Sequence, residues 1–189
     1  LALQSLRATA LPVFQTEFSI EGSVSGGAFE TAWLIHNSLT HANAVAYVYW
    51  DLIWRWQDAD EGGLVAVEVP DPTRWQSARG YKTRSPYYSV RHFAKFTDPG
   101  WTRVGTSSSS DALRVSAFVS PNEDAVTVVI LNVSNTRRDA RLGDTFDGFT
   151  RVAFQSTETT SWQELSIASG DPVVLPASSV TTLAFTRPE

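Results

Sequence analysis

The sequence has no cysteine and no methionine, and it has only two lysines beside thirteen arginines. Without cysteine there is no disulfide, no thiol nucleophile and no thiolate metal ligand, although the redox compartment stays open. No apolar run approaches the roughly 18 residues that span a bilayer, so we expect no membrane segment. The formal charge of −5 argues against a nucleic-acid partner.

What is present indicates a folded chain. Of its 189 residues 42% are apolar and 12% aromatic, whereas disordered chains are poor in aromatics. The first residues, Leu1-Ala2-Leu3, include no methionine and show no signal-peptide pattern. We therefore interpret the chain as part of a longer polypeptide.

A shift in composition near residue 100 predicts two domains, 1–99 and 100–189. Of the 22 aromatic residues 15 precede residue 101, including all five tyrosines, and the second half is richer in Ser, Thr, Val and Asp. Asp98-Pro99-Gly100 supplies turn chemistry at the boundary.

The first half has the pattern of parallel β/α units. We predict a strand over 11–16, a helix over 28–42, a strand over 44–50, a long loop over 51–80, and a helix from Ser85 to about Phe96. The strand over 44–50 is almost wholly apolar, which is typical of a strand buried on both faces. Two such units cannot close a sheet, so we expect the completing half to lie N-terminal to Leu1.

The second half predicts an antiparallel β-sandwich. Residues 113–119 are apolar at every second position, and further strands are expected within 125–133, 149–154, 172–175 and 180–185. Turn sequences separate them, and no helix pattern intervenes. The run Ser107-Ser108-Ser109-Ser110 is interpreted as a hairpin tip.

Glu17 is the first candidate for catalysis. It directly follows a predicted strand, and active sites of parallel β/α folds lie at the carboxyl ends of strands. A carboxylate there suits nucleophilic or acid/base work. The alternative is a glutamate that caps a turn or pairs with an arginine.

Aromatic residues gather on and after the second strand. Sugar rings present apolar C–H faces, so aromatic platforms beside a carboxylate suit a carbohydrate. The alternative is that these side chains pack in the core. Core packing fits Trp54 and Trp56 less well, because they flank Arg55 in a polar stretch. The set comprises Tyr47, Tyr49, Trp50, Trp54, Trp56 and Trp75.

Other catalytic motifs are lacking. His36 and His41 are five residues apart, off the spacing that aligns two metal ligands on one helix face, and no HExxH, nucleotide-binding glycine motif or GxSxG occurs. We expect no metal and no cofactor, and we interpret the three histidines, His92 included, as packing or surface residues. Asn122-Glu123 imitates a glycosidase acid/base motif, but we assign it to a turn between two sandwich strands.

Three segments resemble glycoside hydrolase family 30. Phe14–Ser19 resembles the W-x-T-E-x-S segment that ends the family's seventh barrel strand, with Phe in place of Trp. Residues 35–50 resemble its seventh helix and eighth strand, and residues 87–100 resemble its last helix and the entry to its side sandwich.

The resemblance implies the C-terminal β/α units of a (β/α)8 barrel followed by a β-sandwich side domain, in a secreted retaining β-glycosidase that hydrolyses β-1,4-xylan or xylo-oligosaccharides. It implies that Glu17 is the nucleophile and that Trp50 forms part of the sugar-binding floor. The acid/base would lie on an N-terminal half, present as a separate chain or a missing segment, so we expect this chain alone to be inactive. The other expected substrate-binding residues are Ser19, Tyr47, Trp54, Arg55 and Trp56.

Arg55 is not in register with the arginine stretch that binds glucuronate branches in bacterial family members, so a requirement for glucuronate branches on the substrate does not follow.

Two alternatives to a xylan-hydrolysing enzyme stay open at this point. The chain could belong to a family 30 enzyme for β-glucan or a glucosyl lipid, because stacking reads only the ring face. It could also be a non-catalytic carbohydrate-binding or interaction protein, although such a protein would not need Glu17.

Overall fold

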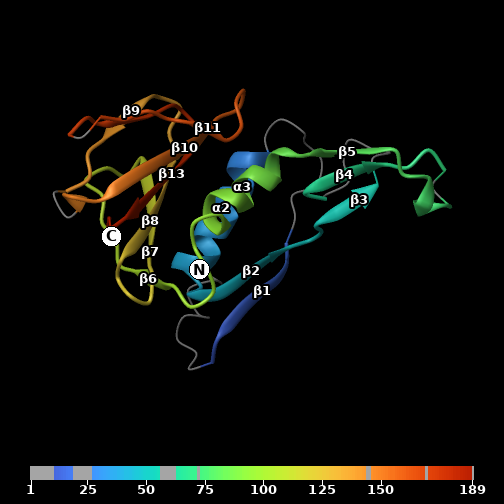
Figure 1. Ribbon diagram of the computed structural model, residues 1–189, viewed down its shortest axis with the longest axis horizontal. Helices are drawn as coiled ribbons and strands as arrows, with labels where there is room; N and C mark the ends of the chain where they lie inside the picture. The colour runs from blue at the N-terminus through green and yellow to red at the C-terminus, as the bar shows by residue number, and fades with distance from the viewer. Residues whose placement is uncertain are drawn as a thin grey trace. The chain divides into compact units, whose positions relative to one another are not determined.

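The computed structural model describes residues 11–18, 27–55, 63–71, 73–143, 146–168 and 170–188 (Figure 1). The chain divides into two compact units, Leu1–Val90 and Arg91–Glu189. The division falls inside the second predicted helix and not at the Asp98-Pro99-Gly100 turn, so the last turn of this helix belongs to the second unit.

The first unit contains the predicted strand–helix–strand element. Strand β1 (Val13–Phe18) pairs in parallel with β2 (Ala44–Tyr49), and helix α2 (Gly27–Thr40) connects them. Buried Ala32 and Ile35 from α2, together with Ala44 and Tyr49 from β2, supply apolar packing. The parallel order places the carboxyl ends of both strands at the same edge.

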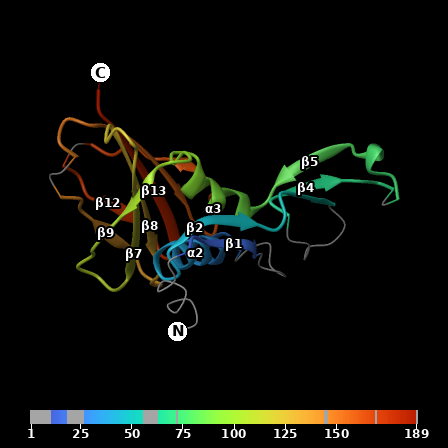
Figure 2. The ribbon, with the colours of Figure 1, turned by 90° about the horizontal axis from the view of Figure 1, so that it is seen from below.

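The prediction of a long loop over 51–80 is wrong in part, because this segment contributes to a three-stranded sheet. Strand β3 (Ile53–Arg55) pairs in parallel with β4 (Val65–Glu68), which pairs antiparallel with β5 (Gly80–Thr83). A short 3-10 helix, η1 (Trp75–Ser77), precedes β5, and helix α3 (Ser85–Ala94) follows it. Figure 2 shows β4 and β5 as an extended hairpin.

The second unit is an antiparallel sandwich, as predicted. Its larger sheet has the order β11-β10-β13-β8-β7-β6, and a two-stranded ribbon pairs β12 with β9. The serine run lies between β6 and β7, which pair antiparallel, so it is a hairpin connection. The strands are β6 (Thr102–Val104), β7 (Leu113–Val119), β8 (Ala125–Asn132), β9 (Arg138–Ala140), β10 (Thr150–Ser156), β11 (Gln163–Glu164), β12 (Val173–Leu175) and β13 (Ser179–Thr186).

The apolar core of the sandwich lies between the larger sheet and the β9–β12 ribbon. Val128 and Ile130 of β8 and Leu183 of β13 pack with Val173 and Leu175 of the ribbon, and all five are buried. Alternating side chains of β8 and β13 therefore face the ribbon, as a sandwich requires.

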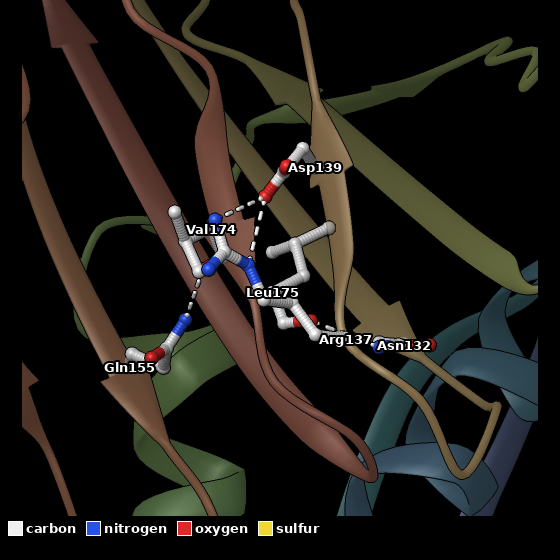
Figure 3. Close-up of polar contacts among 6 residues, drawn as sticks. All are labelled: Asn132, Arg137, Asp139, Gln155, Val174 and Leu175. Carbon is white, nitrogen blue, oxygen red and sulfur yellow. Dashed lines mark hydrogen bonds and ion pairs between the residues drawn. The ribbon is translucent and has the colours of Figure 1, made fainter.

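Two buried amides tie the ribbon to the larger sheet (Figure 3). The Nδ2 group of Asn132 donates to the carbonyl oxygens of Leu175 (3.0 Å) and Pro176 (2.8 Å), and Nε2 of Gln155 donates to the carbonyl of Val174 at 2.9 Å. Asn132 is fully buried, so these bonds satisfy groups that would otherwise be costly to remove from water.

The last turn of α3 joins the sandwich through His92, which is fully buried. The hydroxyl of Thr182 donates to the backbone carbonyl of His92 (2.9 Å) and lies 2.8 Å from its Nδ1, while Nε2 lies 2.8 Å from the Ser156 hydroxyl. Because the single hydroxyl proton of Thr182 is already donated, Nδ1 must carry the proton and donate to it. Burial, reinforced by the charge of Arg91, lowers the pKa of His92 to about 3.

Candidate functional site

Glu17 is the last residue but one of β1, whereas the sequence predicted that it directly follows a strand over 11–16. The side chain is exposed, and the adjoining backbone carbonyl accepts a hydrogen bond from Nε2 of Gln15 at 3.2 Å. In the parallel register Gln15 aligns with Tyr47 and Phe18 with Tyr49, so Glu17 lies one strand away from the end of β2. The carboxylate is therefore accessible at the strand edge where such folds carry out chemistry.

Trp50 directly follows β2 and is 56% exposed. A large aromatic ring that is mainly in water offers a face to a sugar ring without breaking core packing. The Trp50–Asp51 peptide bond is cis. Glu17 and Trp50 thus lie at the carboxyl ends of neighbouring parallel strands.

Tyr47 lies on β2 and is half-buried. Its hydroxyl is buried, and it has no hydrogen-bond partner among the residues that the structure describes. Burial, followed by the neighbouring Tyr49 phenol, raises the pKa of Tyr47 to about 12. The phenol therefore stays protonated at neutral pH, as a hydrogen-bond donor without an acceptor.

Trp54 and Arg55 lie on β3 and contact each other. The Arg55 guanidinium carbon lies 5.9 Å from the centre of the Trp54 ring, and Trp75 meets Trp54 edge to face at 6.5 Å. Two neighbours thus cover much of the Trp54 ring. Trp54 and Arg55 are consequently less available to a ligand than Trp50 is.

Gly63 explains how β3 and β4 approach each other. A Cβ atom at Gly63 would lie 2.8 Å from Cβ and 2.9 Å from the backbone nitrogen of Trp54. No side chain fits in that space without a shift of the backbone of β3.

Two of the expected site residues, Ser19 and Trp56, lie outside the residues that the structure describes. Sequence reasoning did not select Tyr81, which is 76% exposed on β5 in the row that contains Arg55 and Val67. A single tyrosine in an unpredicted four-residue strand carries no sequence signal.

The β1–β2 sheet is more exposed than its sequence predicts. Val45 and Val48 of β2 are 60% and 51% exposed, and Phe14 of β1 is 57% exposed. Among the described residues β2 pairs with β1 alone, so burial on both faces does not hold within this chain.

The remaining predicted features have simpler roles. Asn122-Glu123 lies in the turn between β7 and β8, where Glu123 adopts a positive φ of 59° and the Ser120 hydroxyl binds Asp124 at 2.6 Å. Within the described ranges no group of three or more His, Cys, Asp or Glu side chains could hold a metal, and no helix there is long and apolar enough to cross a membrane.

The sandwich has a family match. Residues 100–183 match the family model of the glycosyl hydrolase family 30 β-sandwich domain. This part of the chain therefore resembles that domain, and the chain resembles the C-terminal part of a family 30 xylanase.

Particular relatives extend the likeness. The glucuronoxylanase XynC of Bacillus subtilis (strain 168) is 29% identical over 110 residues, which are 58% of this chain and 21% of the relative. The solved family 30 subfamily 8 xylanase Xyn30A of Clostridium acetobutylicum is 26% identical with a TM-score of 0.67, over 93% of this chain and 42% of that one. An endo-β1,6-glucanase shares the fold at 15% identity, with a TM-score of 0.64 over 98% of this chain and 38% of that one.

The chain therefore spans about a fifth of the length of the curated relative and less than half of the solved xylanase.

Proposed function

We propose that this chain is part of a secreted retaining β-glycosidase that hydrolyses β-1,4-xylan or xylo-oligosaccharides, with Glu17 as the nucleophile. The observation that carries the proposal is the parallel pairing of β1 with β2, which puts an exposed carboxylate and an exposed tryptophan at neighbouring strand ends. The xylanase likeness supports the choice of substrate. We infer secretion because xylan is a polymer too large to enter cells, so an enzyme that hydrolyses it acts outside them.

In this mechanism the Glu17 carboxylate attacks the anomeric carbon while the glycosidic bond breaks and the acid/base protonates the departing sugar oxygen. Water, deprotonated by the same acid/base, then hydrolyses the glycosyl-enzyme and frees Glu17. Trp50 would hold the apolar face of the sugar beside the carboxylate. Tyr47 would donate its unused hydroxyl proton to the sugar or to a neighbouring segment.

Retention also needs an acid/base carboxyl about 5–5.5 Å from the nucleophile. We propose that a further polypeptide segment supplies it, together with the strands that would close a (β/α)8 barrel on β1 and β2. The exposed Phe14, Val45 and Val48 support this, because apolar strand side chains of this kind are normally covered. Residues 1–99 would then be the C-terminal portion of the catalytic barrel.

An affinity label tests the nucleophile on the chain as it exists. An epoxyalkyl β-xyloside reacts with a carboxylate at a sugar site without help from a general acid. We expect the label on the peptide that contains Glu17, protection by xylo-oligosaccharide, and loss of labelling in Glu17→Gln. Glu30→Gln is the matched control, since it removes an exposed carboxylate at the start of α2. Labelling that persists in Glu17→Gln would exclude Glu17 as the nucleophile.

A gluco-configured epoxide tests the substrate. The fold likeness to an endo-β1,6-glucanase makes glucan the alternative polymer. Faster labelling of Glu17 by the xyloside supports xylan, whereas faster labelling by the glucoside would replace xylan with glucan and leave Glu17 in its role.

A further inference from the structure

Two adjoining hollows open on the sandwich unit. One has a volume of about 490 Å³ and the other about 410 Å³, and both are lined by Arg141 and Leu142. Each volume is within the range of roughly 300–1,000 Å³ that is typical of ligand sites. A shared border makes the pair long enough for an extended ligand.

The larger hollow has an arginine wall on and beside β9. Arg137, Arg138 and Arg141 fall within five residues of a chain whose net charge is −5. Arg137 is neutralised, because its Nη2 lies 3.1 Å from Oδ1 of Asp139 (Figure 3).

Most N–H donors of the Arg138 and Arg141 guanidinium groups have no hydrogen-bond partner among the described residues. Nε of Arg138 has one long contact, 3.4 Å, with the Ser134 hydroxyl, and Nη1 of Arg141 donates to the carbonyl of Gly170 at 2.7 Å. Among the described residues neither guanidinium pairs with a carboxylate. Two planar cations are therefore available, and such groups bind carboxylates through two parallel hydrogen bonds.

The opposite wall is the serine run that joins β6 to β7. Ser108 donates to the carbonyl of Ser110 (3.1 Å), and Ser110 accepts from the backbone of Ala112 (3.2 Å), so both hydroxyls shape their own loop. The hydroxyls of Ser107 and Ser109 make no hydrogen bond to the described residues. We call the hollow between Ser107–Ser110 and the three arginines the serine–arginine groove.

The floor of the serine–arginine groove is apolar. It is formed by Leu113, Val115, Ile130 and Leu142. An apolar floor with hydroxyls on one side and guanidinium groups on the other fits a sugar ring that bears a carboxylate, because the ring face is apolar while its rim is polar.

The second hollow differs in chemistry. The rings of Phe146 and Phe149 line it, as do the carboxylates of Asp147 and Asp171. Arg151 also lines it, but Nη2 of Arg151 already donates to the carbonyls of Ile167 and Ala168. Aromatic rings suit the faces of neutral sugars, and the two carboxylates accept from sugar hydroxyls but repel an anion. The acidic group of a ligand therefore belongs on the arginine side.

We propose that the serine–arginine groove and the adjoining hollow bind an acidic polysaccharide chain, with a uronate carboxylate on Arg138 and Arg141. The identity of the polymer backbone as xylan rests on the proposed function; the charge of its branches does not.

Binding of defined oligosaccharides to the 189-residue chain, measured by calorimetry, tests the proposal. The probes are a glucuronate-substituted xylotetraose, unsubstituted xylotetraose and tetragalacturonate. We expect the substituted xylotetraose to bind more tightly than the neutral one, and Arg138→Gln to weaken it roughly tenfold or more, the effect of losing a charged hydrogen bond. Arg79→Gln, which removes an exposed arginine that lines neither hollow, should leave the affinity unchanged.

A second variant is expected to change the affinity in the opposite direction. Asp139→Asn removes the carboxylate that neutralises Arg137, so it should tighten the binding of the acidic probe several-fold. Thermal unfolding checks that each variant remains folded.

The outcomes separate this site from the proposed function. Arginine-dependent binding of tetragalacturonate without binding of either xylotetraose supports the groove and contradicts xylan as substrate. Four outcomes would each overturn the proposal that the groove binds an acidic polysaccharide. The acidic probes could fail to bind, or their binding could be insensitive to Arg138→Gln. Binding could also be lost only in Trp50→Ala, or inorganic phosphate could displace the probes equally well.

Discussion

Replacement of His92 by glutamine should remove a large part of the acid sensitivity of the sandwich. His92 is fully buried, with Nδ1 on Thr182 and Nε2 on Ser156, and its pKa is lowered to about 3 from an ordinary value of 6.5. Glutamine has an amide that donates and an oxygen that accepts, so it keeps both kinds of hydrogen bond but never takes a proton at these pH values.

The sign and size of the effect follow from linkage. The unfolded chain binds a proton on this histidine below about pH 6.5, while the folded chain does so only near pH 3. Stability from this group is therefore complete above pH 6.5 and is lost as the pH falls toward 3. At roughly 1.36 kcal/mol per unit of pKa, the loss totals about 5 kcal/mol, which is comparable to the whole stability of many domains.

Urea unfolding at a series of pH values measures this loss. Tryptophan fluorescence is a suitable signal, because the Trp162 ring lies 4.9 Å from the His92 ring and beneath the guanidinium of Arg91. Between pH 6 and 4 the free energy of unfolding of the His92→Gln chain should fall less steeply than that of the wild type, by about 1.4 kcal/mol per pH unit. Arg91→Gln removes the second cause of the lowered pKa, so it should raise the folded-state pKa of His92 and make the total loss of stability smaller, while the onset of the loss stays near pH 6.5.

Nitrogen NMR of the imidazole provides an independent check. The bonding of Thr182 requires a proton on Nδ1, and the lowered pKa of His92 keeps the ring neutral at pH 5. A His92 that titrates near pH 6.5, a proton on Nε2 alone, or parallel stability curves for wild type and His92→Gln would refute the reasoning.

Three further predictions concern other parts of the chain. Gly63→Ala should destabilise the β3–β5 sheet by about 1–3 kcal/mol, seen as faster amide exchange in β3 and β4, because the new Cβ overlaps Trp54. Asn132→Leu should lower the free energy of unfolding by about 2–4 kcal/mol in urea titration, since it leaves buried carbonyls of the ribbon without a donor. The chain alone should not hydrolyse an aryl β-xyloside. When the barrel is completed by an N-terminal segment, Glu17→Ala should abolish turnover, and azide should partly restore it with inverted product; full activity in that variant would exclude Glu17 as nucleophile.

The sandwich was predictable because its long strands combine an alternation of apolar and polar residues with turn sequences at both ends. Residues 113–119 alternate in polarity and coincide with β7, and the prediction over 125–133 differs from β8 by one residue. Each is bounded by turn residues. Strands β6, β9 and β11 have only two or three residues, too few for a period of two to be recognised.

The sheet of β3, β4 and β5 was missed for the same reason, and for another. Its strands have three or four residues, and the backbone at Gly63 lies too close to Trp54 of β3 to leave room for a Cβ atom. Such a close approach is a property of the fold and leaves no periodic pattern. The glycine is visible in the sequence, where it reads as an ordinary loop residue.

The candidate catalytic residues and the serine–arginine groove differ in how far the sequence reveals them. Glu17 is the last residue but one of β1, and Trp50 directly follows β2. Parallel pairing of consecutive β/α units brings such strand ends together, so the local pattern predicts their proximity. The serine run and Arg138 are separated by two strands and appear unrelated in the sequence. They become opposite walls of one hollow only because β9 leaves the larger sheet to pair with β12, and this choice depends on packing by Val173 and Leu175. A site whose parts come from different layers of a sandwich therefore requires the tertiary structure.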